Sequence, residues 1–368
     1  MNSQLMHQHG GDLDSIQQKY GIPKEQILDF SGNINPLGFP ESVQNKLAEN
    51  LHIVSTYPDK HYTALRHAIS QYTGAAMEHI VVGNGSSELI SAFIKTINAR
   101  KTLIMGPAYS EYEREAQLCG STFSYFPLKE EDNFQLDVEG LLDSLTQDVG
   151  LFIACNPNNP TGSIITTSQM EVILAHCKRN DIAVMIDETY IEFCDTMEEV
   201  CSIPLVEKYE NLFIIRGISK FFAAPGLRLG YGISSNSHFL QKLKTVQDPW
   251  SVNSLAAFAG EYLFTDTEFM AKTKELISTE KKRMIQELST WKNSKVYPSG
   301  SNFILIRLVS DHISAAEIFE NLIVKRLLIR DASSFTFLDK SYLRFCVLRP
   351  HSNTFLLSEL KKLIETTV

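Results

Sequence analysis

The sequence predicts an α/β protein with a largely parallel sheet that is covered by helices. Apolar runs alternate with helical patterns between residues 80 and 233, and this alternation is typical of parallel strands joined by helices. Turns rich in Gly, Asn or Pro directly follow several of these runs. The length of 368 residues is enough for about two domains. We therefore expect a ligand site at the carboxyl ends of the strands, where open α/β sheets bind their ligands.

The expected elements follow one another in a regular order. The first apolar run is followed by a glycine-rich turn and by a helical pattern that continues to Ile97. A helical tract over residues 254–291 leads to a second region, which has strands near 303–306 and 342–347. No internal repeat or low-complexity linker is recognisable. The strands expected in the main sheet are residues 80–82, 102–105, 152–154, 184–186, 212–215 and 229–233.

Composition and net charge argue against several classes of function. The chain has 43 acidic and 34 basic residues and a net charge of −9, which argues against nucleic acid, because phosphates require a basic surface. An anionic substrate must then be bound by a few local arginines. The six cysteines form no Cys-x-x-Cys pair, so we expect reduced thiols in the cytoplasm rather than a zinc site or disulfides. No apolar stretch approaches ~18 residues, so we expect no membrane span.

The most informative residue is Lys220, which ends the run Arg216-Gly-Ile-Ser-Lys220. A lysine in this setting can form a Schiff base with pyridoxal phosphate (PLP). Ser219 and Arg228, on either side of it in the sequence, are then placed to hold the phosphate of the cofactor. Two alternatives stay open at this point: Lys220 can be a solvated lysine after a strand, and Arg216 can be purely structural.

Two motifs upstream favour the cofactor. The turn that contains Asn159 follows the strand at 152–154, so Asn159 can reach into the site as a neutral hydrogen-bond donor, although an ordinary Asn/Pro turn has the same composition. Asp187 follows the strand at 184–186. PLP chemistry needs a carboxylate against the pyridine nitrogen, because the protonated ring is the electron sink. Strand-end aspartates also cap helices or bind metals, so Asp187 alone does not decide.

A third candidate is the turn Gly83-Asn-Gly85-Ser86-Ser87. Small residues between a strand and a helix let backbone N–H groups and the helix dipole approach a phosphate. Ser86 or Ser87 can add a hydroxyl group, and the sequence leaves open which of them makes the contact. A plain turn from strand to helix is the simpler alternative.

In combination and in this order, the motifs resemble the PLP-dependent fold-type I enzymes of the aminotransferase class I and II family. The similarity extends from His9 to Arg349, and the family's equivalent of the turn at Gly85 binds the PLP phosphate. The resemblance implies a large domain with a mostly parallel seven-stranded sheet and a smaller α+β domain. The implied division is an N-terminal arm with part of the small domain over 1–45, a PLP-binding domain over 46–253, and an interdomain helix with the small domain over 254–368.

The resemblance also implies roles for three tyrosines. Tyr109 corresponds to an aromatic ring that stacks on the pyridine face of PLP. Tyr190, in Asp187-Glu-Thr-Tyr190, joins Asp187 and Lys220 as a catalytic and cofactor-binding residue. Tyr57 corresponds to a tyrosine that reaches the cofactor phosphate of the neighbouring subunit, which implies a homodimer with shared active sites. Without the resemblance, Tyr57 and Tyr109 would be amphipathic core tyrosines.

Substrate contacts follow from the same resemblance. Arg344 corresponds to the family arginine that binds the substrate α-carboxylate, and Arg330 to the position that meets a substrate phosphate. Alone, Arg330 could be a surface ion-pair residue, and a His-Gly-Gly start could be a flexible leader. The segments that resemble the threonine-phosphate decarboxylases of the family contain His9, Gly10 and Asn33.

The implied activity is decarboxylation of O-phospho-L-threonine to (R)-1-amino-2-propanol O-phosphate, a reaction of cobalamin biosynthesis. The alternative is a histidinol-phosphate aminotransferase, which shares the cofactor machinery and differs in which Cα bond is held perpendicular to the ring. A more remote alternative is a non-catalytic PLP-binding regulatory protein. The intact Lys220, Asp187 and Arg344 argue against this last class.

Overall fold

The structure is a computed structural model that describes residues 10–310 and 312–365. Its largest sheet has seven strands in the order β2-β8-β7-β6-β5-β3-β4. β8 runs antiparallel to both of its neighbours, and the other neighbouring strands are parallel. The predicted α/β fold with a mostly parallel sheet is confirmed. The strands are β2 (Ile80–Gly83), β3 (Lys101–Gly106), β4 (Thr122–Pro127), β5 (Leu151–Cys155), β6 (Ala183–Asp187), β7 (Leu212–Gly217) and β8 (Gly230–Ile233).

The sequence predicted every strand of this sheet except β4. The central strands β5, β6 and β7 are buried along almost their whole length, as expected for parallel strands that have helices on both faces. β4 lies at the edge of the sheet, and only one of its six residues is fully buried. It therefore lacks the continuous apolar run by which the other strands were recognised.

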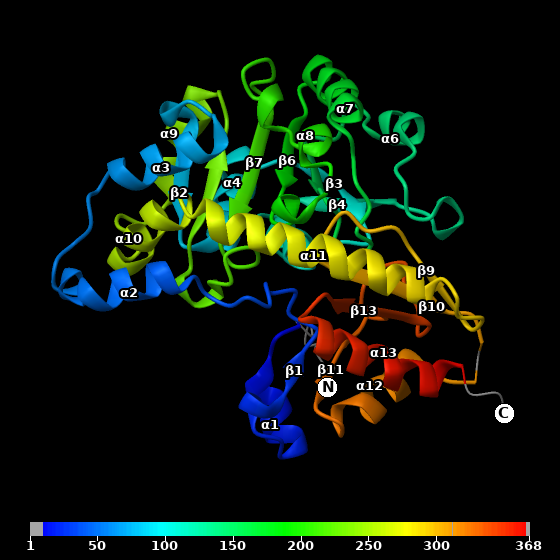
Figure 1. Ribbon diagram of the computed structural model, residues 1–368. Helices are drawn as coiled ribbons and strands as arrows, with labels where there is room; N and C mark the ends of the chain where they lie inside the picture. The colour runs from blue at the N-terminus through cyan, green and yellow to red at the C-terminus, as the bar shows by residue number, and fades with distance from the viewer. Residues whose placement is uncertain (1–9, 311, 366–368) are drawn as a thin grey trace, which may run out of the picture.

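Helices cover both faces of the large sheet, and further helices belong to a second, smaller region of the molecule (Figure 1). None of the helices in the part of the chain that the structure describes is long and apolar enough to cross a membrane. The helices are α1 (Leu13–Tyr20), α2 (Glu41–Glu49), α3 (Thr63–Thr73), α4 (Gly85–Ile97), α5 (Glu111–Leu118), α6 (Val138–Ser144), α7 (Thr167–Arg179), α8 (Met197–Val200), α9 (Ser237–Val246), α10 (Ser254–Leu263), α11 (Thr267–Leu288), α12 (Ala315–Ile323) and α13 (Pro350–Ile364).

The helical tract expected over 254–291 is divided into the two helices α10 and α11. Asp266 caps α11, because its side chain accepts a hydrogen bond from the backbone N–H of Phe269. α10 packs against α2 and α3, beside the large sheet. α11 extends from there along the boundary between the large sheet and the smaller region, where Figure 1 shows it in yellow.

The smaller region contains an antiparallel sheet in the order β12-β13-β10-β9. A short parallel pair joins the two ends of the chain, because β1 (Leu28–Asp29) pairs with β11 (Leu327–Leu328). Residues from the N-terminal segment therefore lie beside a strand of the C-terminal region, as Figure 1 shows for β1 and β11. The strands of the antiparallel sheet are β9 (Ser294–Val296), β10 (Phe303–Leu308), β12 (Arg330–Asp331) and β13 (Tyr342–Cys346).

Candidate active site

A cavity of about 560 Å³ brings together most of the predicted site residues. Cys155 and Asp187, the last residues of β5 and β6, lie in its wall, and so do residues of β12, β13 and the N-terminal segment. The cavity is thus at the carboxyl ends of parallel strands, where the fold class places ligands. The predicted residues that line it are Gly10, Asn33, Ser86, Ser87, Tyr109, Asn159, Asp187, Tyr190, Ser219, Lys220, Arg228, Arg330 and Arg344.

Lys220 lies in the loop that follows β7 and lines the cavity. Its Nζ atom donates a hydrogen bond to the carbonyl oxygen of Gly32, at 2.7 Å. Burial, and next the nearby charge of Arg344, lower the pKa of Lys220 to about 8. A larger fraction of this amine is therefore unprotonated at neutral pH than of an exposed lysine, which suits a nucleophile.

Asp187 is buried at the end of β6. Its Oδ1 atom accepts hydrogen bonds from the backbone N–H and the hydroxyl of Thr189, and its Oδ2 atom accepts one from the Tyr112 hydroxyl at 2.7 Å. Burial raises the pKa of Asp187, and these hydrogen bonds oppose that shift. Over residues 10–310 and 312–365, no cation forms an ion pair with this carboxylate. It is therefore a buried acid that faces the cavity without a counter-charge.

The loop before α4 and the residues around it form an anion-binding cradle. Gly85 begins α4 with a φ of +79°, and a Cβ atom there would collide with the guanidinium group of Arg228. Only glycine allows this close approach. The N-cap residue makes no side-chain capping hydrogen bond, so the first N–H groups of α4 can bind an anion. Ser86, Ser87 and Ser219 line the cavity beside Arg228.

Two tyrosines and Asn33 occupy neighbouring positions of the wall. The Nδ2 atom of Asn33 donates a hydrogen bond to the Tyr190 hydroxyl at 3.2 Å, and burial raises the pKa of Tyr190. Asn33, predicted as a substrate contact, therefore also orients Tyr190. Its Oδ1 atom is buried without a hydrogen-bond partner, so it can accept from a bound molecule. Burial raises the pKa of Tyr109 to about 12.

The two predicted substrate arginines are neighbours across β12 and β13, where Arg330 and Arg344 are directly paired in register. Arg344 donates to the Ser31 carbonyl oxygen at 2.7 Å and to the Oδ1 atom of Asn159. The second contact leaves the amide nitrogen of Asn159 as the donor that the sequence predicted. Arg330 donates to the Ser334 hydroxyl at 2.6 Å. Among the described residues, no carboxylate forms an ion pair with either guanidinium group, so both positive charges are left for a ligand.

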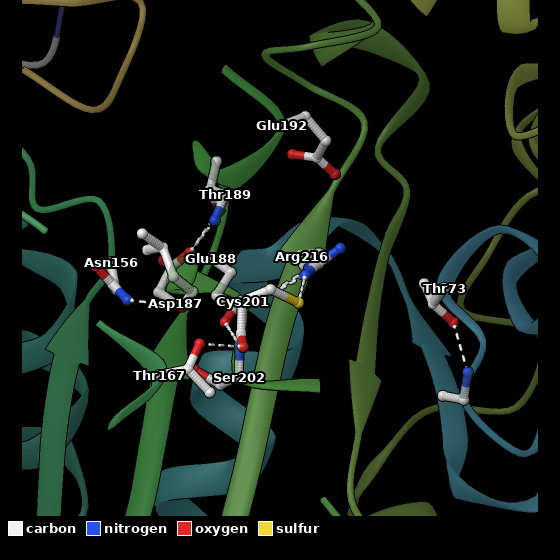
Figure 2. Close-up of polar contacts among 12 residues, drawn as sticks. Thr73, Asn156, Thr167, Asp187, Glu188, Thr189, Glu192, Cys201, Ser202 and Arg216 are labelled. Atoms are coloured by element: carbon white, nitrogen blue, oxygen red, sulfur yellow. Dashed lines mark hydrogen bonds and ion pairs between the residues drawn. The ribbon is translucent and has the colours of Figure 1, made fainter. Parts of the chain in front are cut away.

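Arg216 has the structural role that the sequence left open. Its Nε and Nη2 atoms donate to Oε2 of Glu188 at 2.9 and 2.6 Å, and both side chains are buried. The other carboxylate oxygen of Glu188 accepts from the backbone N–H of Ser202 at 2.7 Å. Figure 2 shows these contacts next to Asp187. The ion pair therefore joins the residue that follows Asp187 to the strand that leads to Lys220.

Two described residues of the predicted site, Gly85 and Tyr57, are not among those that line the cavity. Gly85 lies against Arg228, which does line it. Tyr57 is 80% exposed on the surface, where its ring lies 4.8 Å from that of Trp250. Its predicted contact with a neighbouring subunit stays a prediction. His9 lies outside the described residues. Gly10 does line the cavity, and a Cβ atom at this position would overlap the carbonyl group of Ser31.

Sequence reasoning missed several residues around the predicted ones. Tyr112 and Thr189 bind Asp187, and Ser334 binds Arg330. Tyr112 has a weak signal, because it is a second tyrosine close to Tyr109 in the sequence and lies in the first turn of α5. Thr189 and Ser334 are hydroxyl side chains close in sequence to a charged site residue, at separations where local hydrogen bonds are common.

The chain belongs to the aminotransferase class I and II family, which matches residues 25–360. A protein of Caldanaerobacter subterraneus subsp. tengcongensis, provisionally named threonine-phosphate decarboxylase, is 38% identical over 98% of this chain and 95% of its own length. The threonine-phosphate decarboxylase of Salmonella typhimurium is 33% identical over 97% of this chain and 96% of its own. A solved structure of histidinol-phosphate aminotransferase from Clostridium acetobutylicum has a TM-score of 0.86 and 35% identity, and the match covers 92% of this chain and 99% of that one.

The cavity fits the PLP cofactor that the family implies. A pyridinium ring would supply the positive charge that the buried carboxylate of Asp187 lacks. The cradle at Gly85 and Arg228 offers backbone N–H groups, hydroxyls and a guanidinium group to a phosphate. Lys220 lines the same cavity with an amine of lowered pKa. The three groups that PLP requires are thus present together.

Proposed function

We propose that this protein is a PLP-dependent decarboxylase that converts O-phospho-L-threonine to (R)-1-amino-2-propanol O-phosphate. Near-full-length similarity to two proteins named threonine-phosphate decarboxylase, at 38% and 33% identity, supports the reaction. The arrangement of charges in the cavity supports the class of substrate. The reaction belongs to cobalamin biosynthesis, and one relative of this chain is named for adenosylcobalamin biosynthesis.

The single observation that carries the substrate class is the pair Arg330 and Arg344. The two buried guanidinium groups are held by hydroxyl, carbonyl and amide oxygens rather than by carboxylates. Two buried cations without acid partners are unfavourable until an anion binds. A phosphate carries a charge of about −1.5 to −2 at neutral pH, and an α-carboxylate adds one more. O-Phospho-L-threonine therefore matches the charge that the cavity lacks.

We assign cofactor-binding roles as follows. The first turn of α4 with Ser86 or Ser87, together with Ser219 and Arg228, would hold the phosphate of PLP. Asn159 and Tyr190 would donate hydrogen bonds to its ring substituents, and Tyr109 would stack on the ring face. When bound, PLP supplies an electron sink for the carbanion that forms at Cα.

Each of four residues of the chain would then have a distinct role in the reaction. Lys220 would attach the cofactor through its neutral amine, and its Nζ atom would carry a proton to Cα after carbon dioxide has left. Asp187 would keep a proton on the pyridine nitrogen, because a buried carboxylate stabilises that positive charge. Arg344 would orient the carboxylate that is lost, and Arg330 would hold the phosphate.

A histidinol-phosphate aminotransferase remains the second candidate, because a solved enzyme of that name is 35% identical with a TM-score of 0.86. It would use the same lysine, aspartate and phosphate-binding arginine. The deciding experiment is incubation of the holoenzyme with O-phospho-L-threonine or with histidinol phosphate, each with and without 2-oxoglutarate, while carbon dioxide and glutamate are measured. Carbon dioxide without a need for 2-oxoglutarate would support the decarboxylase. Glutamate from histidinol phosphate, with no carbon dioxide from phosphothreonine, would refute it.

Variants of the arginine pair sharpen this experiment. Arg330→Gln removes a charge-assisted contact to the phosphate, which we expect to lower kcat/KM by roughly tenfold to a hundredfold. Arg307→Gln is the matched control, because Arg307 lies in the same antiparallel sheet, pairs with Glu130 and is outside the cavity wall. Equal losses in both variants would contradict a specific phosphate contact.

Deletion of residues 1–11 tests the N-terminal segment. If His9 and Gly10 contribute to substrate binding, the deletion should impair decarboxylation of phosphothreonine more than it impairs PLP binding. A truncated protein with unchanged kcat/KM would remove these residues from the site.

We also propose that the active unit is a homodimer in the cytoplasm. An exposed apolar surface around Tyr57 supports the dimer, since Leu51, Val54 and Trp250 are exposed as well. The ring contact between Tyr57 and Trp250 would present this tyrosine to a second copy of the chain. All six cysteines are free, which supports a reducing compartment.

A further inference from the structure

The turn between β12 and β13 contains a phenylalanine that contacts both substrate arginines. The guanidinium carbon of Arg330 lies 5.4 Å from the centroid of the Phe335 ring, and that of Arg344 lies 5.9 Å from it. Both distances are within the range at which the negative face of an aromatic ring attracts a cation. The ring is partly buried and packs against the hydrophobic core. One aromatic side chain thus interacts with two positive charges.

This contact offsets the electrostatic repulsion between the two arginines that the sheet register places side by side. Arg330 and Arg344 are directly opposite each other on antiparallel strands, and like charges in that arrangement repel. Burial and the neighbouring Arg344 lower the pKa of Arg330 to about 10. A carboxylate would relieve the repulsion, but it would also neutralise the charges that an anionic substrate needs. The ring of Phe335 attracts both cations without neutralising them.

The neighbouring residue Ser334 holds Arg330 by a second neutral contact. Its hydroxyl oxygen accepts a hydrogen bond from Nη2 of Arg330 at 2.6 Å. Two backbone hydrogen bonds of 3.0 Å close the turn around the ring, from Phe335 to Ala332 and from Leu338 to Phe335. The turn is therefore fixed on both sides of the aromatic residue. Ser334 and Phe335 both line the cavity.

We propose that Phe335 and Ser334 are positioning residues that set the orientation of Arg330 relative to Arg344 for a substrate with a phosphate and a carboxylate. The role of the pair as a substrate clamp rests on the proposed function. The physical role, stabilisation of two adjacent cations by neutral groups, rests on the contacts alone. It predicts that anion affinity depends on the Phe335 ring even where no reaction takes place.

The test compares four holoenzyme variants, Phe335→Leu, Phe335→Tyr, Ser334→Ala and Phe337→Leu. Phe337 is the matched control, because it lies in the same turn, is 52% exposed and does not line the cavity. Two quantities are measured: KM and kcat for carbon dioxide release from O-phospho-L-threonine, and the affinity for inorganic phosphate, obtained from the rise of the unfolding temperature with phosphate concentration. The second readout needs no turnover.

We expect Phe335→Leu to raise KM about tenfold and to weaken phosphate binding by a similar factor, with a smaller change in kcat. Phe335→Tyr keeps the ring and should stay within about twofold of the wild type. Ser334→Ala should weaken phosphate binding about fivefold, and Phe337→Leu should change neither quantity. If Phe335→Leu does not fold, Ser334→Ala decides, and unchanged phosphate affinity in that variant overturns the proposal.

The outcomes separate this inference from the proposed function. Unchanged KM and phosphate affinity in Phe335→Leu, or equal losses in Phe337→Leu, would overturn the positioning role and leave the reaction assignment intact. If the wild type binds phosphate, and Phe335→Leu weakens that binding, but the wild type releases no carbon dioxide, the reaction assignment alone is refuted. A wild-type holoenzyme that phosphate does not stabilise would overturn the positioning role as well, because the arginine pair would then hold no anion.

Discussion

The lowered pKa of Lys220 predicts how fast the apoprotein takes up its cofactor. Burial and Arg344 lower this pKa from 10.5 to about 8. At pH 7 the neutral fraction of an amine rises from roughly 0.03% at a pKa of 10.5 to roughly 9% at a pKa of 8, which is about 300-fold. Only the neutral amine attacks the cofactor. We therefore expect Lys220 to gain a factor of this order over an ordinary lysine at neutral pH.

The assay is the rate of covalent PLP attachment to the apoprotein between pH 6 and pH 10, followed by visible absorbance. The same rate for Nα-acetyl-lysine serves as the reference, because the ionisation of PLP affects both reactions alike. The protein rate should rise with pH up to about 8 and then level off, since the amine is neutral above its pKa. Borohydride reduction followed by peptide mapping should find the label on Lys220.

A variant tests the electrostatic part of this reasoning. Arg344→Gln removes a nearby positive charge, so the pKa of Lys220 should rise and the levelling should move to higher pH. The pKa should stay below 10.5, because burial is the larger cause. Arg307→Gln, outside the cavity wall, should leave the profile unchanged. A wild-type rate that keeps rising to pH 10, in parallel with the reference amine, would refute the lowered pKa.

Three further predictions concern Asp187, the buried pair of Arg216 and Glu188, and Tyr57. Asp187→Asn should leave the fold intact, as circular dichroism would show, but reduce the steady-state turnover rate by orders of magnitude. Tyr112→Phe removes one hydrogen bond to Asp187 and should reduce the turnover rate about tenfold. Near-normal turnover of Asp187→Asn would remove Asp187 from the mechanism. Arg216→Met leaves the buried carboxylate of Glu188 without its ion-pair partner. It should lower the free energy of unfolding, measured by urea denaturation, by about 3–5 kcal/mol. A loss below about 1 kcal/mol would contradict a buried, charged pair. Mixing Tyr57→Ala chains with Asp187→Asn chains should restore activity in heterodimers, in which one site has both residues, and demonstrated heterodimers without activity would argue against a shared site.

The sequence located candidate site residues reliably where a motif directly follows a strand, and their chemical roles stay predictions. The lysine after β7, the aspartate at the end of β6 and the small residues at the start of α4 all line one cavity or border it. Parallel strands explain this success, because their carboxyl ends meet at the same edge of the sheet. Each motif could therefore be placed from the strand that precedes it. The same logic failed for β4, whose half-buried edge position leaves no continuous apolar run.

Contacts between segments that are distant in the chain could not be predicted from the sequence. The register that sets Arg330 opposite Arg344 depends on how β12 pairs with β13, and strands of two and five residues carry too little pattern to fix a register. The bond from Asn33 to Tyr190 joins residues 157 positions apart. The role of Arg216 likewise depends on its partner Glu188, which directly follows the neighbouring strand β6.

The pairing of β1 with β11 has a consequence for the order in which the protein is made. Gly10, Gly32 and Asn33 leave the ribosome before the large sheet, yet they reach the cavity wall beside strands that are synthesised after it. A nascent chain that ends before Leu327 can complete the seven-stranded sheet but has no partner for β1 and no arginine pair. Domains generally fold as units during synthesis, so the sheet that supplies Lys220 and Asp187 is complete while the wall that holds Arg330 and Arg344 is still missing. A stop codon between the end of α11 and Arg330 would thus yield a chain that has Lys220 and Asp187 but neither Arg330 nor Arg344.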